Sequence, residues 1–247
     1  MTRRRFIADT WTDTTATLTG DQALHLARVL RAEPGQIYDI VAGGFLHRSE
    51  IVSVTEQAVL FTLHEELESD SALPVHLLLA VFKFDHFEWA VEKATELGVA
   101  RITPILASRT EKHLSLAALK RVERWRRIAL EAAKQSRRVD VPVIADPVAL
   151  KIALQAETSA RRILLSETER TATLMSALET AHKGGSESTS HAIAVGPEGG
   201  WTPEEMASFA SQQWTPVTLG PRILRAETAA IAALAIAAAV IFDFDSF

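Results

Sequence analysis

Residues 75–98 read VHLLLAVFKFDHFEWAVEKATELG, and this stretch decides the fold class. Its first part, Val75–Phe82, is a continuous apolar run, which is typical of a strand buried on both faces of a parallel sheet. A helix is predicted next, with Asp85 and Glu88 at the spacing of a capping box and Gly98 at its end. Further strands are predicted at Arg101–Leu106, Arg162–Leu165, Ala192–Val195 and Pro216–Leu219. Such alternation of strand and helix predicts an α/β domain with a mostly parallel sheet.

The first 65 or so residues have a different pattern, because apolar and polar residues alternate in the β manner. Gly43-Gly44 predicts a hairpin turn, and Asp21 is a candidate cap for one short helix. Candidate strands are Arg5–Ala8, Thr15–Leu18, Gln36–Val41, Phe45–Val54 and Ala58–Leu63. Five short strands and a helix suit a small closed barrel. With Glu65–Leu73 as an acidic linker, the predicted domains are residues 1–70 and 74–247.

A long helix is predicted from Leu116 to Arg137, and its charge is unusual for this chain. The whole protein has 26 Lys and Arg against 31 Asp and Glu, a net charge of -5, yet residues 101–138 have 11 basic and three acidic side chains. The helix has its apolar residues at Leu116, Leu119, Val122, Trp125, Ile128 and Ala132, and one basic face at Lys120, Arg124, Arg127, Lys134 and Arg138. That face is either solvated or a phosphate-binding surface, and the neighbouring Arg109, Lys112, Arg121 and Arg137 favour the second interpretation.

Several classes of protein are excluded by composition. The chain has no cysteine, which excludes disulfides, thiolate nucleophiles and cysteine-ligated zinc, and we expect no metal. The N-terminus has basic residues without the apolar segment of a signal peptide. The longest apolar run, Ala229–Phe242, has 14 residues, short of the about 20 that a membrane span needs. We therefore expect a soluble cytoplasmic protein without a membrane partner.

Two loops have residues that point to chemistry. The first, residues 194–205, reads AVGPEGGWTPEE, and its three glycines let a backbone approach a ligand closely. Thr202, Pro203 and Glu205 predict the start of a helix directly after it. The second, residues 219–229, reads LGPRILRAETA and leads into an alanine-rich helix. An ordinary strand-to-helix turn is the alternative for the first loop, and a local pair of Arg225 with Glu227 is the alternative for the second.

Together these segments resemble the RsmE family, the 16S ribosomal RNA uridine N3-methyltransferases of the SPOUT superfamily. The two loops are similar to the family's cofactor loops, and FEWAVEKATELGV at residues 87–99 is similar to the first helix of its catalytic domain. Residues 131–138, EAAKQSRR, and residues 25–31, HLARVLR, match other family segments in the right order, so the resemblance covers nearly the whole chain. The chain departs from the family at His86, where an arginine is common, and at Phe82, where a smaller residue or proline is.

The resemblance implies a PUA-like barrel followed by an α/β trefoil knot, S-adenosylmethionine as methyl donor, and a homodimer. It also implies a substrate, uridine 1498 of 16S rRNA in the assembled small ribosomal subunit. The implied cofactor-binding residues are Gly196, Pro197, Glu198, Gly199, Gly200, Leu219, Gly220, Ile223, Leu224 and Arg225. The RNA-binding candidates are Arg3, Arg4, Arg5, His25, Arg28, Arg31, Lys120, Arg124, Arg127, Lys134 and Arg138.

Methyl transfer to uridine N3 needs an in-line approach, loss of the N3 proton and stabilisation of negative charge on the uracil oxygens. Arg225 is the candidate for charge stabilisation, and Glu198 or Glu227 is the candidate for orienting the ligand or assisting the proton. Two alternatives remain open. One is a non-catalytic RNA-binding or ribosome assembly factor, and the other is a SPOUT methyltransferase that acts on another RNA.

Overall fold

The computed structural model describes residues 5–69, 71–182 and 189–242. The chain forms two compact units, one of residues 1–71 with 133–140 and one of residues 72–132 with 141–247. The chain passes from the first unit to the second near residue 71, and residues 133–140 return to the first unit. Residues 183–190, whose sequence has no helix or strand periodicity and predicts a loop, lie mostly outside the described residues.

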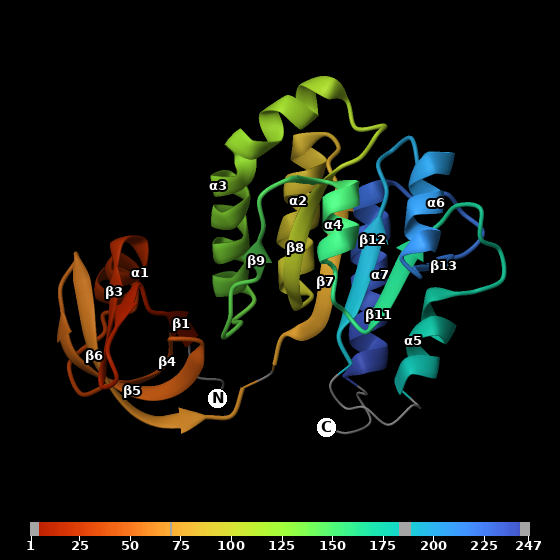
Figure 1. Ribbon diagram of the computed structural model, residues 1–247. Coiled ribbons are helices and arrows are strands. Elements are labelled where there is room, and N and C mark those ends of the chain that lie inside the picture. Colours follow the sequence, from red (N-terminus) through yellow and green to blue (C-terminus); the bar gives the residue numbers. More distant parts are fainter. Residues whose placement is uncertain (1–4, 70, 183–188, 243–247) are drawn as a thin grey trace. The chain divides into compact units, whose positions relative to one another are not determined.

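The smaller unit contains a six-stranded sheet in the order β1-β4-β5-β6-β3-β2 (Figure 1). Its strands are β1 (Arg5–Ile7), β2 (Thr10–Trp11), β3 (Thr15–Thr19), β4 (Ile37–Ala42), β5 (Phe45–Val54) and β6 (Ala58–Leu67). Only two residues separate β1 from β2, although these strands lie at opposite ends of the order. Ala8 N donates to Val41 O (2.8 Å) and Asp9 N donates to Thr17 O (3.0 Å), so the sheet curls back on itself around its core.

The turns and helices of this unit agree only in part with those predicted from the sequence. Gly43 and Gly44, at φ 62° and 89°, form the predicted hairpin turn between β4 and β5. The predicted helix divides into α1 (Gly20–Leu24) and a π-helix, η1 (His25–Val29). Asp21 is not its cap, because the helix begins at Gly20 without a side-chain cap.

The larger unit is an α/β domain, as predicted, with all its strand pairs parallel and the order β10-β8-β7-β12-β11-β13. A seventh strand, β9, pairs with β8. The strands are β7 (Leu73–Ala80), β8 (Val99–Leu106), β9 (Val143–Ile144), β10 (Val148–Ala149), β11 (Arg161–Leu165), β12 (His191–Val195) and β13 (Thr215–Val217). The helices are α2 (Phe84–Glu96), α3 (Lys112–Gln135), α4 (Leu150–Ala156), α5 (Leu174–His182), α6 (Pro203–Ser211) and α7 (Ala226–Ile241).

The larger unit has two hydrophobic cores, and strand β7 contributes side chains to both. Leu77 and Leu79 face one core with α2, α3, α5 and α7, whereas Leu78 faces the other core with α4 and α6. Successive residues of a strand point to opposite faces, so a run of leucines serves both layers. No helix among the described residues is long and apolar enough to cross a membrane.

Two predictions about helices are wrong. Asp85 and Glu88 form no capping box, because α2 begins at Phe84 and Glu88 instead accepts hydrogen bonds from Arg121 and Arg124 of α3. Helix α3 begins four residues before the predicted start, and Leu116 and Leu119 are 72% and 65% exposed. Its buried residues are Leu114, Ala118, Val122, Trp125, Ala129, Ala132 and Ala133.

Candidate active site

A cavity of about 600 Å³ lies in the larger unit where three parallel strands end. The segments that follow β11, β12 and β13 all line it, because parallel strands bring their carboxyl ends to the same edge of a sheet. Pockets of this size are typical of sites for small molecules and cofactors. We call residues 196–201, after β12, the glycine loop and residues 218–225, after β13, the arginine loop.

The glycine loop is shaped by close contacts that exclude larger residues. A Cβ at position 196 would lie 3.0 Å from Trp201 Nε1, and a Cβ at position 199 would lie 3.2 Å from Arg109 Cδ. Gly200 has φ 71°, and its N–H donates to Pro197 O (2.8 Å). Glycine at these positions therefore lets the loop turn tightly between the strand and α6.

The end of this loop is anchored by Glu205, as the sequence predicts. Thr202 is the N-cap of α6 and accepts from Glu205 N, while Thr202 N donates to Glu205 Oε2 (2.8 Å). The other carboxylate oxygen, Oε1, accepts from Ser108 N (2.7 Å), which follows β8. One buried carboxylate thus joins the loop after β8 to the loop after β12.

Arg109 strengthens the same junction, although it is not among the predicted cofactor-binding residues. Its guanidinium donates to Gly199 O (2.5 Å) and Trp201 O (3.4 Å), and the side chain lines the cavity. Arg109 also lies so close to Gly199 that a side chain at that position would require the arginine to shift.

The arginine loop begins with a local turn. Thr218 Oγ1 donates to Gly220 O and accepts from Gly220 N, both at 3.1 Å, and Gly220 has φ 123°. The loop ends at Arg225, the N-cap residue of α7, in extended conformation. Ile223 lines the cavity and is 80% exposed, so this loop contributes accessible apolar surface to the cavity lining.

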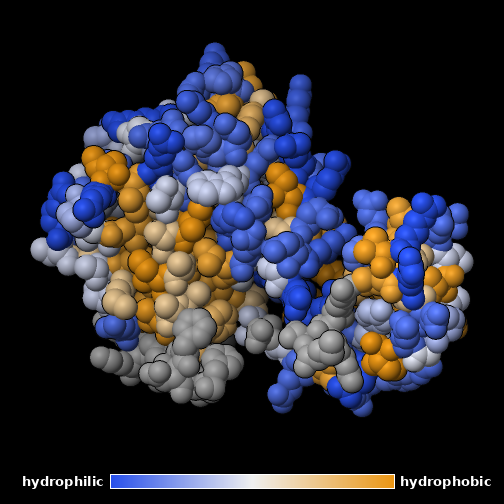
Figure 2. All heavy atoms as spheres, turned by 180° about the vertical axis from the view of Figure 1, so that it is seen from behind, coloured by the Kyte–Doolittle hydropathy of each residue, from blue (hydrophilic) through white to orange (hydrophobic). Residues whose placement is uncertain are grey.

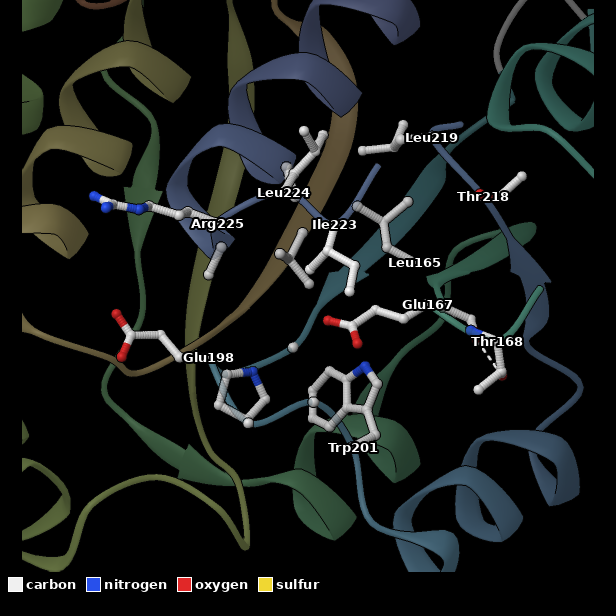
Figure 3. Close-up of a pocket in the computed structure, with 18 of the residues that line it drawn as sticks. Leu165, Glu167, Thr168, Glu198, Trp201, Thr218, Leu219, Ile223, Leu224 and Arg225 are labelled. Atoms are coloured by element: carbon white, nitrogen blue, oxygen red, sulfur yellow. Dashed lines mark hydrogen bonds between the residues drawn. The ribbon is translucent and has the colours of Figure 1, made fainter. Parts of the chain in front are cut away.

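All ten predicted cofactor-binding residues line this one cavity. Figure 3 shows Leu165, Ile223 and Leu224 around its middle, with Arg225 and Glu198 together at one side. The cavity therefore combines apolar side chains, backbone groups of two glycine-containing loops and a charged side. Such a lining suits a ligand with a flat apolar ring system and a charged end.

Glu227, the third predicted catalytic residue, is placed differently. It is buried in the first turn of α7, and its Oε1 lies 3.2 Å from Nδ1 of His86, which does line the cavity. Glu227 therefore faces the cavity through His86. Phe82, the other departure from the family pattern, is a core residue whose ring packs edge-on against Phe87 at 5.5 Å.

A third segment of the cavity, after β11, was missed. Leu165, Ser166, Glu167, Thr168 and Arg170 line it. Close by, the Glu169 carboxylate accepts the N–H groups of Thr171, Ala172 and Arg170, and these hydrogen bonds lower its pKa to about 2. The predicted strand Arg162–Leu165 could have indicated this segment, because ligands bind at the carboxyl ends of parallel strands.

The predicted RNA-binding residues lie in several places. Arg3 and Arg4 are outside the described residues, and Arg31, Lys120 and Arg127 are exposed. Arg28 pairs with Glu56 (2.8 Å), Arg124 with Glu88 (2.8 Å) and Arg138 with Asp140 (2.6 Å). Arg5, His25 and Lys134 line a second cavity, in the smaller unit.

No group of three or more His, Cys, Asp or Glu in the described part of the chain could hold a metal ion.

Comparisons with known proteins agree with this geometry. A family model described as RNA methyltransferase domain matches residues 69–238. Ribosomal RNA small subunit methyltransferase E of Bacillus subtilis is 34% identical over 89% of this chain and 88% of its own length. The protein of that name from Synechocystis is 33% identical, over 90% and 72%.

Solved structures are similar over nearly the whole chain. Ribosomal RNA small subunit methyltransferase E from Neisseria gonorrhoeae, bound to S-adenosyl methionine, has a TM-score of 0.76 at 28% identity and covers 95% of this chain and 96% of its own. A putative methyltransferase from Legionella pneumophila, also with bound cofactor SAM, has a TM-score of 0.77 at 26% identity and covers 97% and 98%.

Proposed function

The chain belongs to the ribosomal RNA small subunit methyltransferase E family, and from this premise we propose that it methylates N3 of a uridine, position 1498, of 16S rRNA in the assembled small ribosomal subunit. The methyl donor is S-adenosylmethionine, which is bound in the similar structures from Neisseria and Legionella. The observation that supports this most directly is that the glycine loop and the arginine loop line one cavity.

The residues present fit that donor. The glycine loop brings its backbone to the cavity and packs closely on Trp201 and Arg109, since a Cβ at position 196 would lie 3.0 Å from Trp201 Nε1 and one at position 199 would lie 3.2 Å from Arg109 Cδ. Leu165, Leu219 and Leu224 offer apolar contacts for an adenine ring, and the loops offer backbone N–H and C=O groups for its edges. The donor supplies an activated methyl group on a sulfonium.

The chain's own residues position and polarise the uridine. In the transfer, a bond forms from uridine N3 to the methyl carbon as the carbon–sulfur bond breaks, and N3 loses its proton. Arg225, at the charged side of the cavity, stabilises negative charge that develops on the uracil oxygens. Glu198 lies beside it, and Glu227 acts through His86; one of these carboxylates assists the removal of the N3 proton or orients the ligands.

The proposed domain structure is a PUA-like RNA-binding barrel and a SPOUT domain with a trefoil knot. The curled sheet of the smaller unit supports the barrel. In support of the knot, the chain leaves β13 at one edge of the sheet, yet the next helix, α7, packs against β7 and β12 in its middle and against both α2 and α5.

We also propose a homodimer. After Glu227 and Thr228 in its first turn, helix α7 is apolar on all sides, and Ile231, Ala232, Ala235, Ile236 and Ala239 along it are exposed or half-buried. Figure 2 shows apolar side chains gathered on the face of the larger unit to which α7 belongs. A second copy that covers this face would remove apolar surface from water.

Methylation mapping by mass spectrometry of 16S rRNA tests the function. A strain without this gene should lack the methyl group at N3 of uridine 1498, and restoring the gene should restore it. A methyl group that persists in the deletion strain refutes the assignment, and loss of a methyl group elsewhere assigns another RNA position. Isothermal titration with S-adenosylmethionine separates the enzyme from a non-catalytic assembly factor.

A further inference from the structure

The smaller unit has a cavity of its own, of about 320 Å³. Strand β1, the π-helix η1 and the residues around the end of α3 contribute to it. Its lining residues are Arg5, Phe6, His25, Val29, Leu30, Lys134, Gln135 and Arg137, all of which belong to the smaller unit.

The charge of this cavity is one-sided. Three of its lining residues are cations and one is histidine, and none of the described residues that line it is acidic. The whole chain nevertheless has a net charge of -5. A concave surface with charges of one sign concentrates ligands of the opposite sign, so the cavity suits an anion.

The cavity also offers an aromatic ring. Phe6 is half-buried and packs against Tyr38 with ring centroids 6.0 Å apart, so its position is fixed. Aromatic side chains next to cationic ones are typical of sites where an unstacked base and its phosphate bind together.

Arg137 has a backbone conformation that favours glycine, so the presence of arginine there points to a role for its side chain. Helix α3 ends with Arg137 N donating to Lys134 O (3.3 Å) and Arg138 N donating to Ala133 O (3.0 Å), a Schellman motif. Arg137 has φ 61° at the position of this motif where glycine is favoured. Its carbonyl accepts a hydrogen bond from the Arg5 guanidinium. His25 and Val29 belong to a π-helix, a conformation that is frequent at functional sites.

We propose that this cavity binds one nucleotide of single-stranded ribosomal RNA, with a backbone phosphate at Arg137, Lys134 and Arg5 and the adjacent base against Phe6. It is a second contact for RNA, formed by residues other than those of the methyl-transfer cavity. The inference rests on the proposed function, because it takes RNA as the ligand.

The variant Arg137→Gly tests this proposal, because it should maintain or raise the stability of the protein and lower its affinity for RNA. Glycine relieves the left-handed backbone conformation, so the urea midpoint of unfolding should stay the same or rise. Affinity for a fluorescein-labelled, 12-nucleotide single-stranded RNA should fall about three- to tenfold, measured by anisotropy. The slope of log K against log salt should decrease in magnitude by about one, because one phosphate contact is lost.

Two controls isolate the charge from the backbone. Gln213 also has a left-handed backbone, at φ 59°, and belongs to the larger unit, so Gln213→Gly should leave RNA affinity unchanged. Lys151→Gln removes one exposed positive charge on α4 and should leave the affinity unchanged as well. With small ribosomal subunits as substrate, Arg137→Gly should raise KM and leave kcat unchanged.

An Arg137→Gly protein that binds the RNA as wild type does, with the same salt slope, would overturn the proposal. So would a cavity that binds inorganic phosphate in an Arg137-dependent manner while RNA affinity stays unchanged, since it would then serve a free anion or a phosphorylated protein. Failure of the proposed function has a different signature. Wild-type protein would then bind RNA through Arg137 but transfer no methyl group to the subunit.

Discussion

Replacing Glu205 by alanine should destabilise the larger unit and loosen the cofactor cavity together. The carboxylate is 6% exposed and accepts two backbone hydrogen bonds, from Ser108 N at 2.7 Å and from Thr202 N at 2.8 Å. A backbone N–H left without a partner costs about 1–3 kcal/mol when buried. Ser108 is exposed and Thr202 is half-buried, so water replaces part of the loss. We therefore expect a decrease of about 2–3 kcal/mol in the free energy of unfolding.

The glutamine variant refines this expectation. Glu205→Gln retains one acceptor oxygen but places an amide N–H₂ opposite a second backbone N–H, so it should lose about half as much stability. The glycine loop ends at Thr202, and its anchoring should matter for ligand affinity. A loss of about 1.4 kcal/mol in binding corresponds to a tenfold weaker affinity for S-adenosylmethionine, which is the change expected for Glu205→Ala.

Urea unfolding followed by tryptophan fluorescence measures the stability, since Trp201 and Trp214 both pack against Phe209 in this unit. Isothermal titration measures the affinity. Glu204→Ala is the matched control, because Glu204 is the exposed neighbour in the same helical turn and should cost about 0.5 kcal/mol. If Glu205→Ala unfolds like this control and binds the donor as wild type does, the carboxylate does not connect the two loops as argued.

Three further predictions concern the cavity and the buried charges. Gly196→Ala places a Cβ 3.0 Å from Trp201 Nε1, so calorimetry should show donor affinity reduced at least about tenfold; unchanged affinity would contradict the close packing. Arg225→Ala should lower the turnover on small ribosomal subunits about 100-fold, and full turnover would remove Arg225 from charge stabilisation. Burial raises the pKa of Glu157, but hydrogen bonds from His76 and Ser159 outweigh it and lower the pKa from 4.5 to about 2. Its contribution to stability, about 3 kcal/mol, is complete above pH 4.5 and should be lost as the pH falls toward 2. Urea unfolding of Glu157→Gln, measured as a function of pH, should lack this part of the acid dependence.

Local chemistry made much of the larger unit predictable. Thr202, Pro203 and Glu205 start α6 as their sequence indicates, because a capping box satisfies N–H groups that a helix start leaves free. The apolar run after Val75 forms a strand buried on both faces, although it begins at Leu73. Both loops that the sequence singled out lie at one cavity because parallel strands share a carboxyl edge.

Tertiary contacts decided the rest. Leucines at positions 114, 116 and 119 of α3 are all compatible with helical periodicity, and only packing in the core of the larger unit selects Leu114 as the buried one. The spacing of Glu88 from Asp85 fits a capping box for α2, but its carboxylate instead accepts hydrogen bonds from Arg121 and Arg124, which are more than 30 residues away in sequence. Arg109 reaches the glycine loop across 90 residues of chain, and no local pattern could have indicated that contact.

The smaller unit includes residues 133–140, and this has a consequence for how the protein is made. A ribosome that has just released the sixth strand, β6, must add more than 60 residues before the last piece of that unit emerges. At about 5–20 residues per second, the smaller unit waits several seconds for it. During that interval Arg5 lacks the carbonyl of Arg137, so a fragment ending near residue 70 should be less stable than the same residues in the finished chain.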